Sequence, residues 1–179
     1  MLNYADKHNI ILNIKDKYED GWSPLLSAVT SDHSNLEIVR LLIEYANKHN
    51  VILNLNEKNK NGNSCIMHAI TKNNTKIVKF LIDHANKYNI IMELNERTKI
   101  GSSFILLAIH FDNTEIFKLL IDRHNIILNI NDKNNDGWSP ICSVSGHNNI
   151  RIVKLLIDYA NRHNITLKIN DKSKMIILQ

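Results

Sequence analysis

The sequence predicts an all-α solenoid, in which antiparallel helix pairs stack side by side and hairpin loops project from the stack. A glycine followed by a serine-containing phrase recurs at positions 21, 62, 101 and 137, which are 41, 39 and 36 residues apart. Each glycine phrase precedes a short apolar segment, and a longer amphipathic segment such as 38–43 follows it. A period of this length is typical of proteins built by repeating one supersecondary unit.

The composition is that of an ordinary folded domain. Of 179 residues, 44% are hydrophobic and 22% are charged, which is typical of globular chains and unlike disordered ones. Each unit of a solenoid buries its apolar face only against its neighbours, so the chain is predicted to form one array. Its predicted units within 1–179 are a partial repeat 1–17, repeats 18–57, 58–96, 97–132 and 133–171, and the start of another at 172–179.

Three features of the sequence bear on its compartment. It has no run of about 18 uncharged apolar residues, so we expect no membrane span and no membrane partner. Its first residues lack the basic and apolar regions of a signal peptide. Cys65 and Cys142 lie at different positions in their units and form no metal or redox motif, which favours a reducing compartment. We therefore expect a cytoplasmic location, or an intracellular one that includes the nucleus.

The inner helices are predicted to begin at a serine. Ser23-Pro24 and Ser139-Pro140 are strong helix starts, because the serine oxygen can cap an orphan N–H and proline at the first helical position has no N–H to lose. Ser64 and Ser103 fill the same slot in the other two units. The apolar segments that follow predict inner helices over 24–30, 65–71, 104–110 and 140–145.

Each outer helix is predicted to follow a short polar break. Asn and Asp suit the end of an inner helix, because they accept the left-handed conformation better than most residues; the break residues are Asn73, Asp112 and Asn148. In the first unit, helical spacing predicts an apolar face at Ile38, Leu41, Leu42 and Tyr45. The charged opposite face is typical of a solvated surface. We expect the outer helices to continue one to two turns past positions such as Ile43, and the third to be shorter by nearly one turn.

The repeated phrases add up to a long motif. The second unit fills it with Gly62, Ser64, Cys65, Ile66, Ala69, Ile77-Val78, Phe80-Leu81-Ile82 and Leu94-Asn95, and the fourth with Gly137, Ser139, Pro140, Ile141, Ile152-Val153, Leu155-Leu156-Ile157 and Ile169-Asn170. This pattern resembles the ankyrin repeat, whose motif runs Gly-x-Thr-Pro-Leu-His-x-Ala-Ala, Glu-Ile-Val-x-Leu-Leu-Leu and Val-Asn-Ala. The resemblance covers nearly the whole chain. It implies an L-shaped stack with hairpins on one side, and a role in binding proteins.

The chain departs from this family pattern in three ways. The family's repeat is typically about 33 residues long, whereas these units are longer, and the excess lies after the outer helix. The histidine of the family's first helix is missing, so we expect apolar packing in its slot, which holds Leu26, Met67, Leu106 and Cys142. Neither end shows a polar capping unit. We therefore expect the ends to contact further repeats or another copy of the chain.

No combination of residues predicts catalysis, a cofactor or a metal. Equivalent positions form a row of His8, His49, Tyr88, His124 and His163, but packed helices lie about 8–10 Å apart, whereas zinc needs its nitrogen ligands at about 2 Å. The sequence also lacks Gly-x-Ser-x-Gly, P-loop and His-Glu-x-x-His motifs. We expect a protein that is not an enzyme.

The variable positions predict a surface that binds a protein partner through hairpin tips and the concave inner-helix face. The slot after the missing histidine differs in nearly every unit while neighbouring core slots stay apolar. Two tryptophans beside hairpin glycines are either binding hot spots or packed against a neighbouring hairpin. The candidate residues are Tyr18, Asp20, Trp22, Ser27, Lys60, Asn63, His68, Lys99, Ser102, Leu107, Asn135, Trp138 and Ser143.

Two other functions were weighed against protein binding. Hairpin lysines could meet phosphates, but acidic neighbours dilute their field, so nucleic acid is not the expected partner. Alternatively, the array is a structural spacer or scaffold segment of a longer ankyrin-repeat protein whose activity lies elsewhere.

Overall fold

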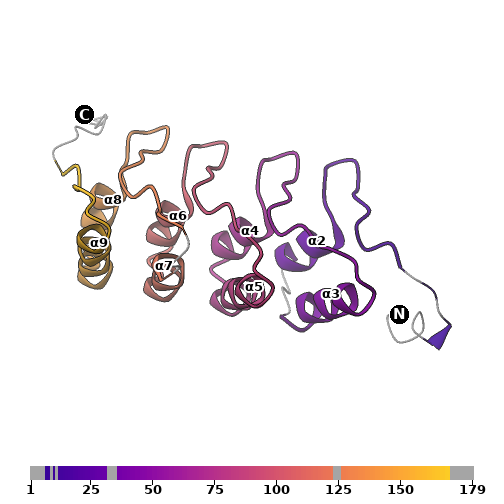
Figure 1. Cartoon of the computed structure of the whole chain (residues 1–179). Coiled ribbons are helices and arrows are strands. Elements are labelled where there is room, and N and C mark those ends of the chain that lie inside the picture. The colour runs from indigo at the N-terminus through magenta and orange to yellow at the C-terminus, as the bar shows by residue number, and fades with distance from the viewer. Residues whose placement is uncertain (1–6, 9, 11, 32–35, 123–125, 170–179) are drawn as a thin grey trace.

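A computed structural model describes residues 7–8, 10, 12–31, 36–122 and 126–169. In this part of the chain the structure is all-α, as the sequence predicted, with eight helices standing in pairs along one row (Figure 1). The helices are α2 (Pro24–Thr30), α3 (Leu36–Lys48), α4 (Cys65–Thr71), α5 (Thr75–Lys87), α6 (Phe104–His110), α7 (Thr114–Ile121), α8 (Pro140–His147) and α9 (Ile150–Arg162).

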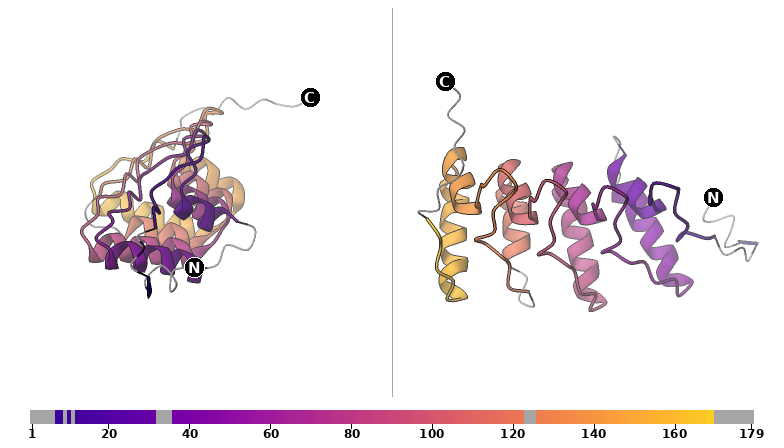
Figure 2. Two further views of the ribbon diagram at one scale, coloured as in Figure 1. Left: turned by 90° about the vertical axis from the view of Figure 1, so that its right-hand side faces the viewer. Right: turned by 90° about the horizontal axis from the view of Figure 1, so that it is seen from above.

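The array has two layers of helices and a row of hairpins. Helices α2, α4, α6 and α8 form the inner layer, and α3, α5, α7 and α9 the outer layer, while the hairpins project to one side (Figures 1 and 2). Where the chain is described, the hairpins carry only isolated antiparallel bridges, Lys58 with Ser64 and Arg97 with Ser103. We call the surface formed by the hairpins and the inner helices the inner face.

Serine caps set the start of every inner helix. The hydroxyl oxygens of Ser23, Ser64, Ser103 and Ser139 each accept a hydrogen bond from the backbone N–H three residues later, at 3.3–3.5 Å. The predicted bounds of α2, α4 and α6 are confirmed. The prediction for the fourth inner helix was two residues too short, because α8 keeps its helical conformation until Asn148, where φ is 55°.

Left-handed residues end the helices, as predicted for the inner layer: φ is 53° at Asn73 and 51° at Asp112. Helices α3, α5 and α9 have 13 residues, which confirms the predicted extension. Helix α7 has eight residues, so it is shorter by more than the predicted turn. The sequence reasoning missed the asparagines that open the outer helices: Asn74, Asn113 and Asn149 cap α5, α7 and α9 by accepting from the N–H groups of Ile77, Ile116 and Ile152.

One continuous core runs through the array. Small or apolar residues are fully buried where inner helices approach closely, as at Ala69, Ala108 and Val144. The expected apolar packing in the slot of the missing histidine is confirmed at Leu26, Met67 and Leu106, which are at most 5% exposed.

The predicted apolar face of the first outer helix needs a correction. Ile38 is 47% exposed and Leu41 is 42% exposed, although Tyr45 is buried. The equivalent Ile77 and Ile116 are fully buried, because an outer helix packs on each side of α5 and α7. In the described residues, no such helix lies on the N-terminal side of α3.

Polar ladders connect successive hairpins. Cations of one hairpin pair with acids of the next hairpin, as Lys17 does with Glu57 (2.5 Å), Lys58 with Glu96, and Arg97 with Asp132 (2.6 Å). Asn56, Asn95 and Asn131 each donate to a carbonyl and accept from an N–H in the return segment that follows the next outer helix. These contacts fix the spacing of the hairpins, so that their side chains form one surface.

Candidate functional site

The backbone of the hairpin tips is satisfied partly within each hairpin and partly by the preceding hairpin, where the Lys60 N–H donates to the Asp20 carbonyl and the Asn135 N–H to the Ile100 carbonyl. Asn59 Oδ1 accepts from the N–H groups of Asn61 and Asn63, and Asn134 Oδ1 accepts from those of Asp136 and Trp138. Such local side-chain bonds are what makes asparagine a good turn residue. The side chains carried at the tips are therefore not needed to close the turns.

The structure leaves most of the predicted tip residues accessible. Tyr18 is 72% exposed, and four others are exposed: Asp20, Lys60, Lys99 and Asn135. Asn63 is half-buried. Ser102 is a correction, since it is only 7% exposed; its N–H donates to Thr98 Oγ1 inside the hairpin, so it belongs to the base of the tip.

The two tryptophans have different environments. Trp22 is half-buried and stacks on His68 of the next repeat, with ring centroids 5.2 Å apart. It therefore packs against the neighbouring repeat, but its contact is with helix α4 and not with a hairpin as the alternative expected. Trp138 is 42% exposed, which leaves much of its ring open to a partner.

His68 is held in one protonation state by its neighbours. Asn59 Nδ2 lies 3.2 Å from His68 Nε2. Because Asn59 Oδ1 is already used by two N–H groups, its amide nitrogen must donate to Nε2, which must then be unprotonated. Burial, and secondarily the positive charge of Lys72, lowers the pKa of His68, which also favours the neutral ring.

The variable inner-helix slot lies on the inner face. Ser27, His68 and Ser143 are half-buried there. The expectation that Leu107 is exposed was wrong: it is 7% exposed and packs into the core. It nevertheless lines the floor of a groove between α6 and α8.

This groove on the inner face has a volume of about 470 Å³. It brings together four of the predicted residues from two successive repeats, namely Ser102, Leu107, Trp138 and Ser143. Sequence reasoning missed the rest of its lining, which consists of Ile100, Leu106, His110, Asn134, Asp136, Gly146 and His147. The sequence feature that could have revealed the groove is the pair of small residues Ser143 and Gly146, which lie three residues apart on one helix face.

The titratable groups do not assemble into a catalytic or metal-binding set in the described residues. No group of three or more His, Cys, Asp or Glu side chains is placed to hold a metal ion there. Burial raises the pKa of the Cys65 thiol to about 12, far from that of a reactive thiolate. A hydrogen bond with Glu96, and secondarily its charge, raises the pKa of Glu93, but both side chains lie at the surface.

The row of equivalent histidines follows the ends of the outer helices and packs locally. His49 lies against Tyr45 and His163 against Tyr159, each with ring centroids 4.3 Å apart, and Tyr88 lies against His84. His124 lies outside the described residues. The rings of His49, Tyr88 and His163 thus contact the aromatic ring one turn earlier on their own helix.

The amino-acid sequence matches a model of a known repeat family. A sequence model of ankyrin repeats (three copies) matches residues 3–92 and again 85–171. The chain belongs to the ankyrin-repeat family. No curated protein matches this ankyrin chain. Ankyrin repeats are generally modules for protein–protein interaction, and the family is typically non-catalytic.

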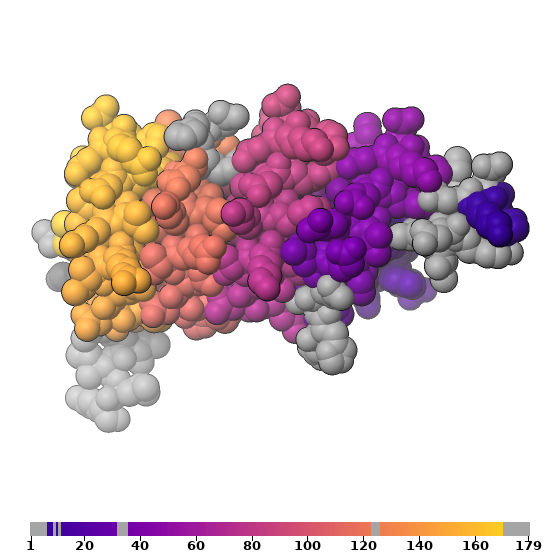
Figure 3. All heavy atoms as spheres, turned by 90° about the horizontal axis from the view of Figure 1, so that it is seen from below, coloured from indigo at the N-terminus to yellow at the C-terminus, as the bar shows by residue number. Residues whose placement is uncertain are grey.

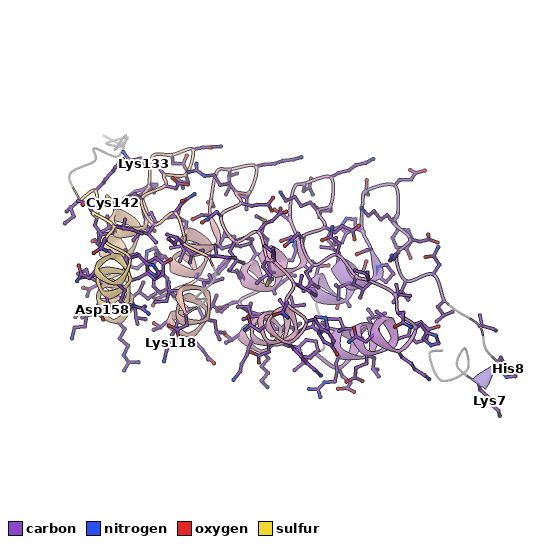
Figure 4. The ribbon with its side chains drawn as sticks, viewed as in Figure 1. Lys7, His8, Lys118, Lys133, Cys142 and Asp158 are labelled. Atoms are coloured by element: carbon purple, nitrogen blue, oxygen red, sulfur yellow. The ribbon has the colours of Figure 1, made fainter. Side chains whose placement is uncertain are left out.

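The surface opposite the inner face is formed by the outer helices α3, α5, α7 and α9. Lys118 and Asp158 project from this side, whereas Lys133 lies in the hairpin row (Figure 4). Seen from the outer-helix side, the successive repeats follow one another as consecutive bands (Figure 3). Each described helix is too short or too polar to cross a bilayer.

Proposed function

We propose that this ankyrin array is a non-catalytic protein-binding module that recognises its partner through the hairpin tips and the inner face. One observation carries the proposal: the exposed tips and the half-buried Ser27, His68 and Ser143 of the variable inner-helix slot share one surface. Asn59 and Asn134 stabilise their turns by accepting hydrogen bonds from backbone N–H groups of the same turn. The exposed tip side chains are therefore available for recognition.

The charge distribution supports a protein partner over nucleic acid. Three of the hairpin cations, Lys17, Lys58 and Arg97, form ion pairs with acids of the next hairpin. Binding to nucleic acid depends on cations that neutralise phosphates. These ion pairs reduce the number of hairpin cations that can do so. A cytoplasmic location is part of the same proposal, supported by two unpaired cysteines of the kind that persist in a reducing compartment.

The proposal is tested with a pair of charge-matched variants. Lys60→Ala with Lys99→Ala removes two exposed cations from the tips, and Lys79→Ala with Lys118→Ala removes two from the outer helices. A partner captured by the wild-type chain is then titrated against all three proteins. We expect the tip variant to bind about tenfold more weakly, which corresponds to about 1.4 kcal/mol, and the outer-helix variant to bind like the wild type.

Two results would contradict the proposal. Equal binding by the tip variant and the wild type would remove the hairpins from the site. Loss in the outer-helix variant alone would place the site on the opposite surface. Far-UV circular dichroism and melting temperature serve as folding controls, and neither should change, because all four lysines are exposed.

A further inference from the structure

The groove between α6 and α8 exists because two positions on α8 carry small side chains. At these positions α8 has Ser143 and Gly146, whereas α6 has Leu107 and His110. The corresponding residues of α4 are His68 and Thr71. Since residues three apart lie on the same helix face, the small pair opens space along one side of α8.

Neither the backbone nor the packing requires glycine at position 146. Gly146 is absent from the positive-φ residues, unlike the four hairpin glycines, and a Cβ added to it would meet nothing within 4 Å. Glycine inside a helix costs roughly 1 kcal/mol relative to alanine. Glycine at position 146 therefore makes helix α8 less stable than alanine would, and its effect on the structure is to widen the groove beside Leu107.

The walls of the groove are suited to an apolar side chain. Leu106 and Leu107 form its floor. Ile100 is 63% exposed and Trp138 is 42% exposed along its edges. Apolar concave sites with a few polar groups are typical binding sites, and exposed aromatic anchors dominate the energy of many interfaces.

The polar groups of the groove include one carboxylate among neutral hydroxyl, amide and imidazole side chains. Asp136 is the one Asp, Glu, Lys or Arg among its lining residues. Lys99, which adjoins Ile100, leans toward the preceding hairpin, with Cγ about 4.0 Å from the place where a Cβ on Gly62 would lie. His147 Nδ1 lies 2.9 Å from the Ser143 carbonyl, so Nδ1–H donates to that oxygen.

We propose that this groove binds an extended segment of a protein partner, which inserts one leucine- or phenylalanine-sized side chain between Leu107 and Trp138 and places a lysine or arginine over Asp136. Charge complementarity selects a basic flank, because the carboxylate of Asp136 attracts a cation and would repel an acidic side chain. The volume of about 470 Å³ suits a side chain together with part of its backbone. This inference rests on the proposed protein-binding function and names the chemistry of the partner.

The test uses peptides selected from a random twelve-residue phage library on the wild-type full chain. Selected peptides are synthesised and titrated by fluorescence polarisation against variants. Gly146→Leu and, separately, Ser143→Met fill the groove from two positions, and Asp136→Asn removes its charge. Thr30→Leu, at the position of the first repeat equivalent to Gly146, and Asp158→Asn, on the outer helix α9, are the matched controls.

The proposal expects peptides that share one large apolar residue next to a basic one. Affinity should fall at least about tenfold in the two filled variants and about threefold to fivefold in Asp136→Asn, and stay unchanged in both controls. Circular dichroism must show wild-type helix content in each variant. Gly146→Ala should bind within about twofold of the wild type, because a methyl group leaves most of the groove open.

Three outcomes would overturn the proposal: no enrichment of peptides, peptides without the apolar and basic pair, or equal binding to the filled variants. The lysine pair described above separates this failure from failure of the proposed function. If Lys60→Ala with Lys99→Ala weakens the natural partner while the filled variants bind normally, the inner face is the site and the groove is not. If neither set of variants changes binding, both proposals fail.

Discussion

Asn149 makes two separable contributions at the junction of the third and fourth repeats. Its Oδ1 accepts from the N–H of Ile152 at 3.0 Å and caps α9. Its Nδ2 donates to Asp112 Oδ1 at 2.6 Å and to Thr114 Oγ1 at 3.2 Å in the preceding repeat. The structure therefore predicts that three substitutions of one residue will divide the stability of the junction into its parts.

The expected sizes follow from these bonds. Loss of an N-terminal cap costs about 1 kcal/mol. A hydrogen bond to a charged acceptor contributes about 1.5–3 kcal/mol when protected, and about 1 kcal/mol is expected here because Asp112 is exposed. Asn149→Ala should therefore lower the unfolding free energy by about 2 kcal/mol. Asn149→Ser should lose about half as much, because serine keeps a capping oxygen but cannot reach Asp112.

Asn149→Asp adds a dependence on pH. The new carboxylate keeps the cap but faces Asp112, and two close carboxylates raise the pKa of the pair in the folded state. The folded variant then binds more protons than the unfolded chain near about pH 4–5, so the stability present at low pH is lost as the pH rises through that range. Relative to wild type, this variant should be destabilised near pH 7 and recover near pH 4.

Urea unfolding followed by far-UV circular dichroism, at both pH values, measures all four proteins. Native-state hydrogen exchange at Ile152 reports the junction itself, because repeat arrays can open locally. If Asn149→Ser were as unstable as Asn149→Ala, the contact with Asp112 would carry no energy. If the pH response of Asn149→Asp matched that of wild type, the two carboxylates would not interact.

Three further predictions concern other parts of the array. Gly101→Ala should lower the unfolding free energy in urea by about 1–2 kcal/mol more than Gly62→Ala does. Both glycines have positive φ, but only at Gly101 would the added Cβ lie 2.9 Å from a backbone nitrogen of the next hairpin. Equal losses in the two variants would contradict this prediction. Lys15→Asn should extend the asparagine ladder to the first repeat, raise stability by about 1 kcal/mol and slow hydrogen exchange at Asn54; unchanged exchange would show that the ladder does not continue. Because burial and a nearby positive charge lower the pKa of His68, stability should fall as the pH drops below about 6.5, where the unfolded chain gains a proton that the folded one resists; His68→Gln should flatten this slope, and an unchanged slope would assign it to other groups.

The site illustrates which features sequence patterns can reveal. Ser143 and Trp138 were identifiable because they vary within a repeated frame. Gly146 was not singled out, because a helical glycine becomes informative only when the space around its Cα is known. Leu107 was expected at the surface from its slot, yet the packing of α6 against α8 buries it.

The ladders show the same division. Cations and acids recur at equivalent positions of the hairpins, but from the sequence we interpreted them only as surface charges of opposite sign that partly cancel. Folding places Arg97 beside Asp132 of the next hairpin, a pairing across a full period that no local pattern encodes. In the same way, Asn113 was not recognised as a bridge to Asn73 and Thr75.

The sequence by itself determined the repeat, the inner-helix starts and the left-handed helix ends, because caps, prolines and left-handed residues act over a few neighbouring residues. Its periodicity also determined the family and the stacking of helix pairs. Only the tertiary structure decided which residues of the inner face are accessible, since exposure depends on side chains contributed by the next repeat. The groove beside Trp138 is the clearest case: it is the space that two adjoining repeats leave between them.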